Sequence, residues 1–359
     1  MTTQTPVVPP GGAAPAATTI DFETTKEVGY YHLVWRRFKQ RKIAYVAAIT
    51  MVVLILSCYV LPIFLPADCP DLSQTDLGPF SVGHSTNAIC GVGTHFHLLG
   101  TDANGRDLLV RNLEGGRISL LVGFATMVVT IFIGTILGAL SGFFGGIIDT
   151  VITAVTNATL SIPSVLILII IVKTFNSDGH ATPMRNIVLA PSRVPIIGGF
   201  FTSLNNNISD SSMTVALICA AISLIAWPFV ARIVRSVILS VREKEFVEAA
   251  RAVGTPRGRL ITRHLIPNAL GPIVVAASLT IGAAILTESA ISFLGYGVNP
   301  PTATWGNILE EGRGDVTNGT VAGFLFDVYP GMLILVTVLC FNYIGDALRD
   351  AFDPRSIER

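Results

Sequence analysis

The sequence predicts an all-α integral membrane protein with six transmembrane helices and one large cytoplasmic loop. Of its 359 residues, 51% are hydrophobic and only 13% are charged, about half the charged share of a typical soluble domain, which is near 25%. The apolar residues gather in six runs long enough to cross the ~30 Å hydrocarbon core of a bilayer. These observations exclude a soluble globular enzyme, and a formal net charge of zero offers no electrostatic basis for nucleic-acid binding.

The apolar runs set the order of the predicted elements. The first run has 23 residues and spans roughly 34 Å as a helix. The six runs are 43–65, 118–141, 147–172, 213–238, 269–294 and 326–348. Around them the chain divides into 1–35, a disordered tail; 36–66, the first transmembrane helix; 67–117, an extracytoplasmic loop; 118–348, a five-helix core with the loop 240–268; and 349–359, a second tail.

The distribution of basic residues predicts the orientation. With the N-terminus in the cytoplasm, most of the 24 Lys and Arg residues lie in cytoplasmic segments, as the positive-inside rule requires. The tail 1–35 is rich in Thr, Pro and Ala and lacks the pattern of a signal peptide. Both termini are therefore expected in the cytoplasm, in a multi-pass protein of the cell membrane that contacts the lipid bilayer.

The five cysteines lack the spacing of a structural zinc site. Cys58, Cys219 and Cys340 fall within predicted spans and are expected to remain buried thiols. Cys69 and Cys90 both fall in the predicted extracytoplasmic loop, where an oxidising compartment favours a disulfide between them. The alternative is two independent free thiols.

Small residues repeat along the second span at a four-residue spacing. They are Gly134, Gly138, Gly142 and Gly146. In lipid, such a stripe lets two helix backbones approach closely. It fits either an interface with another subunit or packing within this chain.

The largest cytoplasmic loop is expected to form two short helices with a break between them. Good helix formers occupy 245–253, and their apolar residues repeat at helical spacing on one face. These residues are Phe246, Ala249, Ala250 and Val253. Gly254 is placed to end the helix in a left-handed conformation, with Thr255 as the N-cap of the next helix and Pro256 in its first position.

The exposed surface of the first short helix suits docking of another protein. It is small and apolar where the alanines lie, so a partner can approach closely. Arg242, Glu248 and Arg251 supply charged anchors around it. The alternative is an amphipathic helix that lies on lipid headgroups.

This loop resembles the EAA loop of ATP-binding-cassette (ABC) importer permeases. The family pattern is Glu-Ala-Ala, three residues, Gly, nine residues and then I-x-L-P. The matching residues are Glu248, Ala249, Ala250, Gly254 and Pro267. His264 and Ile266 stand where the pattern has Ile and Leu, but Arg263, His264, Pro267 and Asn268 are similar to the RH-x-x-PN version of the dipeptide and oligopeptide group.

The narrower resemblance extends over roughly 97–355. The stretch 97–123, with its GTD-x-x-GRD segment, resembles an external segment of that group, with Val110 where the group usually has Ser. The stretches 288–306 and 330–355 are similar to its last two signature segments. The chain therefore resembles the C-type permease subunit of the dipeptide, oligopeptide and nickel transport group.

The resemblance implies the partners and the coupling residues. It implies a second homologous permease, two ATPase subunits and an extracytoplasmic substrate-binding protein. The implied ATPase-coupling residues are Glu245, Phe246, Glu248, Ala249, Ala250, Arg251 and Gly254. Peptides are the expected substrates, and nickel chelates and oligosaccharides remain alternatives within the group.

No enzymatic site is expected on this chain. A nucleotide-binding loop needs G-x-x-x-x-G-K-[ST], and none of the five lysines follows a glycine. ATP and Mg are therefore expected on the partner ATPase, with no cofactor on this chain. The rival ion-driven carrier would place acidic residues at mid-membrane, whereas those here lie near the ends of the predicted spans. The lack of H-E-x-x-H also disfavours an intramembrane hydrolase.

Two charged clusters are expected to be structural. Asp102 and Asp107 flank the turn Asn104-Gly105, and three nearby arginines can pair with them in a partly helical outer layer. These arginines are Arg106, Arg111 and Arg117. Cation binding by the two aspartates is the alternative. Near the end of the last span, Asp346 is expected to pair with Arg349 or with a loop arginine, and a solvated helix end is the alternative.

Overall fold

The computed structural model describes residues 30–65, 77–85, 93–102, 104–175, 210–317 and 321–352. The elements in chain order are α1 (Tyr30–Gln40), α2 (Lys42–Phe64), β1 (Ser81–Ser85), β2 (Gly93–His97), α3 (Leu108–Phe144), α4 (Gly146–Ser161), α5 (Ser164–Phe175), α8 (Asp210–Val241), α9 (Glu245–Ala252), α10 (Arg257–Leu260), a π-helical turn (Ile261–Leu265), α11 (Ile266–Phe293), α12 (Trp305–Thr317) and α13 (Val321–Phe352). The two strands pair antiparallel.

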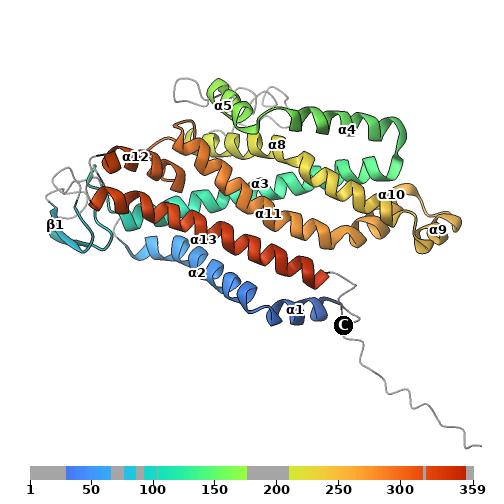
Figure 1. Cartoon of the computed structure of the whole chain (residues 1–359), viewed down its shortest axis with the longest axis horizontal. Helices are drawn as coiled ribbons and strands as arrows, with labels where there is room; N and C mark the ends of the chain where they lie inside the picture. Colours follow the sequence, from blue (N-terminus) through green and yellow to red (C-terminus); the bar gives the residue numbers. More distant parts are fainter. Residues whose placement is uncertain are drawn as a thin grey trace, which may run out of the picture.

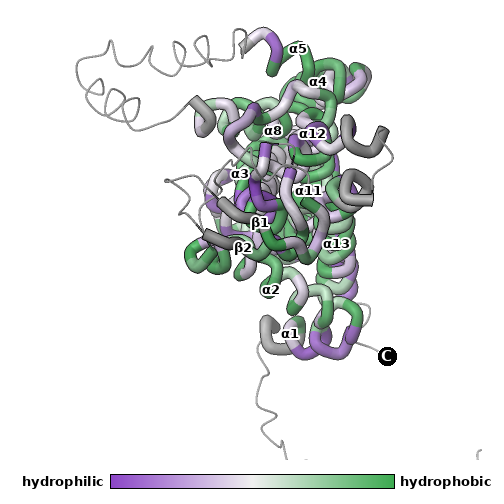
Figure 2. The backbone as a smooth tube through the Cα atoms, turned by 90° about the vertical axis from the view of Figure 1, so that its left-hand side faces the viewer, coloured by the Kyte–Doolittle hydropathy of each residue, from purple (hydrophilic) through white to green (hydrophobic). Residues whose placement is uncertain are grey.

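Five helices of this part of the chain are long and apolar enough to cross a membrane. They are α2, α3, α8, α11 and α13. Figure 1 shows them lying lengthwise beside one another, with the hairpin and α12 at one end of the bundle and α9 at the other. Hydrophobic residues dominate these helices, whereas α1 carries a hydrophilic stretch (Figure 2). The chain is therefore a multi-pass helical membrane protein.

The predicted span 147–172 corresponds to two helices, α4 and α5. They meet at 87° and together count as at most one further span, which would make six. The bend follows from Pro163, because a proline ring disfavours helical conformation in the residue before it. That residue, Ile162, is extended at φ −97° and ψ 135°.

Helix α3 begins ten residues before the predicted span 118–141. Its N-cap is Asp107, whose Oδ1 accepts the N–H groups of Leu109 at 2.8 Å and Val110 at 3.1 Å. Such a cap satisfies two of the free N–H groups of the first turn. The outer charged segment therefore continues directly into a membrane helix.

The glycine stripe of α3 packs against α8 within the same chain. A Cβ atom at Gly134 would lie 2.6 Å from Val230 Cβ, and one at Gly138 would lie 2.5 Å from the Ala231 carbonyl oxygen. A Cβ atom at Gly142 would lie 2.9 Å from the Arg235 carbonyl oxygen. Three of the four glycines thus serve packing within this chain, the second of the two alternatives above.

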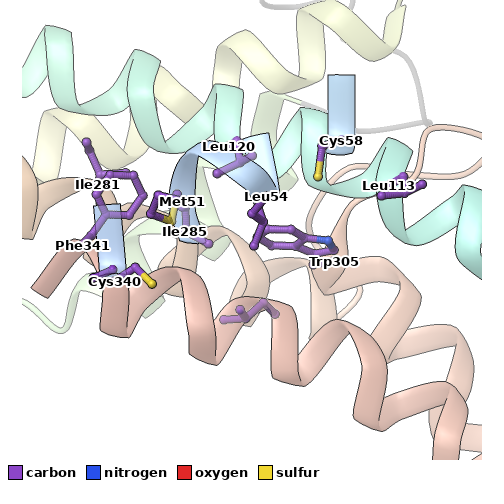
Figure 3. Close-up of a cluster of buried hydrophobic side chains, with 12 residues drawn as sticks. Met51, Leu54, Cys58, Leu113, Leu120, Ile281, Ile285, Trp305, Cys340 and Phe341 are labelled. Atoms are coloured by element: carbon purple, nitrogen blue, oxygen red, sulfur yellow. The ribbon is translucent and has the colours of Figure 1, made fainter. Parts of the chain in front are cut away.

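A buried cluster joins α2, α3, α11, α12 and α13 near the middle of the bundle (Figure 3). Phe341 lies beside Ile281 and Met51 in this view, while the ring of Trp305 lies beside Leu54. Trp305 is fully buried, and its Nε1 donates to the Asn112 carbonyl oxygen at 3.0 Å. The start of α12 is therefore held against α3.

Candidate functional site

Helix α9 of the loop between α8 and α11 is anchored to the bundle mainly by the buried side chain of Val247. Val247 is completely buried in a cluster with Leu260 and Leu265 of the loop, Ile238 of α8 and Ala139 of α3. The apolar face predicted from helical spacing did not include Val247, so its anchoring role was missed. Its burial orients α9 and leaves the opposite surface of that helix free.

Most of the predicted coupling residues lie on the free surface of α9, whereas Ala250 packs partly against the buried cluster. Phe246 is 43% exposed and Val253, just after the helix, is 85% exposed. Glu245, Glu248, Ala249 and Arg251 are also exposed, and Ala250 is half-buried. Figure 1 shows α9 at the extreme end of the bundle, beyond the membrane helices. The surface therefore combines apolar area with charges of both signs, as a protein-docking surface does.

Gly254 ends α9 in the predicted left-handed conformation. Its φ is +79°, and its N–H donates to the Arg251 carbonyl oxygen at 3.0 Å. A Cβ at this position would have no neighbour within 4 Å in this chain. The expected N-cap at Thr255 is wrong, because α10 begins at Arg257 and Pro256 occupies the N-cap position without a side-chain hydrogen bond.

The residues that resemble RH-x-x-PN lie where α10 continues into α11 through the π-helical turn. Pro267 lacks an N–H group and falls in the first turn of α11, where proline is tolerated. The side-chain amide of Asn268 donates to the His264 carbonyl oxygen at 2.6 Å. The wide turn and this hydrogen bond connect the loop to α11 without an interruption in helical structure.

The opposite end of the bundle carries the predicted aspartate–arginine network. Oδ2 of Asp102 lies 2.7 Å from Arg106 Nε and 2.8 Å from Arg111 Nη1. Asp102 is 2% exposed and Arg111 is fully buried, so both need charged partners. Glu311 of α12 completes the network, with Oε2 2.5 Å from Arg111 Nη1 and 2.8 Å from Arg106 Nη2.

The network supports a structural role over cation binding. Oδ1 of Asp102 accepts the N–H groups of Asn104 and Arg106, and its Oδ2 accepts from two arginines, so both oxygens are engaged. Within the described ranges, no three or more His, Cys, Asp or Glu side chains are grouped to hold a metal ion.

Two members of the expected network have other partners. Among the described residues, Asp107 pairs with no arginine: it caps α3, and its Oδ2 lies 2.8 Å from His97 Nδ1. In the same part of the chain Arg117 pairs with no aspartate, and its guanidinium lies over the ring of Tyr59 at 5.4 Å from the centroid. The outer layer is thus smaller than expected and is completed by a residue from α12.

A buried acidic residue near the same end was not predicted as a site residue. Glu288 of α11 is completely buried and accepts hydrogen bonds from Ser292 at 2.8 Å and Ser119 at 3.1 Å. The Ser119 hydroxyl oxygen in turn accepts the backbone N–H of Trp305 at 3.2 Å. Glu288 therefore supports the junction of α3, α11 and α12.

The remaining predicted residues have separate outcomes. Cys69 and Cys90 lie outside the described residues, whereas Cys58, Cys219 and Cys340 are free and buried. Asp346 and Arg349 are exposed on α13, and neither forms an ion pair within the described parts of the chain. This is the solvated alternative. The nearby ion pair instead joins Arg41 to Asp350 at 2.5 Å.

Comparison with known proteins gives consistent matches. Residues 134–358 match the family model for the binding-protein-dependent transport system inner membrane component. Residues 29–79 match the N-terminal transmembrane domain of oligopeptide transport permease C.

Individual relatives cover almost the whole chain. The oligopeptide transport system permease protein OppC of Haemophilus influenzae is 37% identical over 89% of this chain and 87% of its own. The dipeptide transport system permease protein DppC of Alkalihalophilus pseudofirmus is 36% identical over 89% of this chain and 90% of its own. Among solved structures, a MetNI methionine ABC transporter chain aligns with 67% of this chain and 94% of its own, at 20% identity and a TM-score of 0.47.

Proposed function

Because this chain belongs to the family of binding-protein-dependent transport system inner membrane components, we propose that it conducts di- or oligopeptides as one half of the pore of an ABC importer. The peptide assignment is supported by the oligopeptide and dipeptide permeases that share 37% and 36% of its residues over nearly full length. The other half of the pore is a second homologous permease. Substrate arrives from an extracytoplasmic binding protein.

The free surface of α9 is the contact for a separate ATPase subunit. The exposure of this surface at the end of the bundle is the observation that supports coupling to an ATPase. Phe246 and Val253 provide apolar area, and Glu248 and Arg251 provide charges on either side of it. ATP and Mg are used by two such ATPase subunits. This chain contributes no nucleotide site.

Movement of the ATPases reaches the pore through the buried side of the same loop. Val247 shares one apolar cluster with residues of α3, α8 and the α10–α11 segment. Close-packed clusters transmit displacement because they have low compressibility. When the ATPases close on ATP, the docked α9 moves and carries these membrane helices between inward-open and outward-open arrangements.

The proposed orientation places α9 and both termini in the cytoplasm. Basic residues are frequent at this end, and exposed arginines lie both in α9 and just before α2. The positive-inside rule assigns such an end to the cytoplasm. The hairpin, the Asp102 network and α12 then lie outside, where they face the binding protein.

Reconstitution tests the proposal directly. The complete complex is placed in proteoliposomes with ATP inside and the cognate binding protein outside, and uptake of dipeptides, longer peptides, nickel chelates and oligosaccharides is compared. The expected result is ATP-dependent uptake of peptides alone. Uptake of a nickel chelate or an oligosaccharide without peptide uptake would refute the substrate assignment, and uptake driven by an ion gradient without ATP would refute the transporter class.

A further inference from the structure

A cavity of about 290 Å³ lies at the α12 end of the bundle, between α2, α3 and the segment that leads into α12. Its wall includes Tyr59 of α2, Glu114 and Arg117 of α3, and residues 301–303. It is separate from α9, and none of its lining residues belongs to the Asp102 network. Its volume is near the lower end of the range of small-molecule sites.

Two opposite charges face this cavity without neutralising each other. Glu114 and Arg117 are one helical turn apart on α3, a spacing at which an ion pair commonly forms. Here the Arg117 guanidinium instead lies over the Tyr59 ring, 5.4 Å from its centroid. Glu114 forms no ion pair or side-chain hydrogen bond within the described parts of the chain. The cavity therefore offers one carboxylate and one guanidinium to a ligand.

The walls of this cavity are held in place by the fold. Residues 302 and 303 lie three and two positions before Trp305, whose ring nitrogen and backbone N–H donate to Asn112 and Ser119 of α3. Tyr59 is held over Arg117 and lies within hydrogen-bond distance of its carbonyl oxygen, at 3.5 Å. A site with fixed walls loses little conformational entropy when a ligand binds.

We propose that this cavity binds the two charged ends of a short peptide, with Glu114 receiving the ammonium group and Arg117 the carboxylate. The proposal rests on the peptide function given above and identifies free, short peptides as the ligands of this subsite. An arginine matches a carboxylate through two parallel hydrogen bonds.

The test uses three probes with the reconstituted complex: dialanine, N-acetyl-dialanine and dialanine amide. Uptake of each is measured for the wild type, Glu114→Gln and Arg117→Gln. Glu114→Gln is expected to reduce dialanine uptake by roughly tenfold or more, the effect of one lost charge-assisted contact, and to leave the N-acetyl probe unchanged. Arg117→Gln is expected to reduce dialanine uptake similarly and to leave the amide unchanged.

Matched controls separate this subsite from general effects. Glu310→Gln and Arg313→Gln alter exposed charges of α12, and Arg313 also lies over an aromatic ring, Phe293, at 5.8 Å. Both controls are expected to retain the wild-type ratios among the three probes. Because the binding protein is the same in every sample, a changed ratio belongs to the permease.

The outcomes also distinguish the two proposals. No peptide uptake by the wild type would overturn the proposed function. Normal peptide uptake with wild-type probe ratios in both cavity variants would overturn the subsite alone, as would an equal loss for all three probes. Vesicles with and without phosphatidylethanolamine provide the last comparison: if removal of that lipid reproduces the variant ratios, the cavity holds a zwitterionic headgroup and the peptide subsite is wrong.

Discussion

At Gly254, the backbone has a φ of +79° that L-residues with side chains rarely adopt. Gly254→Val is therefore expected to cost about 1 kcal/mol or more in local stability. Within this chain the space around the residue is open, so any larger effect arises from a docked partner. We expect Gly254→Val to lose ATPase binding and ATP-dependent uptake, measured by co-purification and proteoliposome transport.

Gly254→Ala is the matched control for this prediction. Alanine also has to adopt the left-handed conformation, but its side chain is much smaller, and the extra strain of β-branched valine is measured as a loss of stability of the purified protein. A valine defect in ATPase binding that exceeds the alanine defect by more than this stability loss supports close contact with the ATPase at this position. Wild-type uptake by the valine variant would contradict the coupling role of the loop.

The carboxylate of Asp102 neutralises part of the positive charge of two buried arginines, Arg106 and Arg111. Replacement of Asp102 by Asn removes one of the two carboxylates that the described residues supply to Arg106 and Arg111, the other being Glu311. Removing one member of a buried ion pair is strongly destabilising, so Asp102→Asn is expected to cost about 3 kcal/mol. Thermal unfolding in detergent measures the loss, with the exposed Glu310→Gln as control. Recovery of stability with excess divalent cation would favour a metal site instead.

Individual residues were easier to predict than their partners. The sequence placed Asp102, Arg106 and Arg111 together because they lie within ten positions of one another. Glu311 is 200 residues from Arg111, and no local spacing relates them. Val247 was missed for a different reason: the apolar stripe of α9 was assigned by periodicity, and periodicity does not say which of two apolar directions faces the protein.

Helices α3 and α8 illustrate packing at the scale of elements. Their close approach depends on the absence of side chains at positions such as Gly138, where a Cβ would lie 2.5 Å from a backbone oxygen. Gly138→Ala is therefore expected to separate the helices and to lower the unfolding temperature of the purified protein, with a cost of roughly 1–3 kcal/mol.

Gly331 of α13 provides the contrast for this substitution. A Cβ there would have no neighbour within 4 Å, so Gly331→Ala is expected to be neutral or to stabilise its helix by roughly 0.5–1 kcal/mol. Both variants are compared by thermal unfolding in the same detergent. Equal behaviour of the two would mean that the α3–α8 contact contributes little.

The sequence predicted the positions of the membrane helices better than it predicted where helices begin or break. The five membrane helices follow from the apolar runs, because a span must be long and hydrophobic whatever it packs against. The extension of α3 to Leu108 depends on the Asp107 cap, and hydropathy carries no information about caps. The break between α4 and α5 had a local signal in Pro163, but the surrounding run is so apolar that length dominated the prediction.

At the scale of the whole molecule, orientation is open to a direct test. Leu98 at the hairpin end and Arg251 on α9 are both exposed, so a cysteine at either position is accessible on its own side. In cells that carry the protein with Cys69 and Cys90 replaced by serine, a membrane-impermeant thiol reagent is expected to label Leu98→Cys from outside. Arg251→Cys is expected to react only after permeabilisation, and the reverse pattern would invert the proposed topology.

The length of α3 has a mechanical consequence. Its 37 residues form a rod of about 55 Å. Near its start the rod holds Arg111 of the outer network, and near its end Ala139 lies in the cluster that anchors α9. A rotation of only about 5° around one end of such a rod moves the other end by roughly 5 Å. One continuous helix can thus convert a small rotation at the α9 end of the bundle into a displacement at the opposite end as wide as an amino-acid side chain.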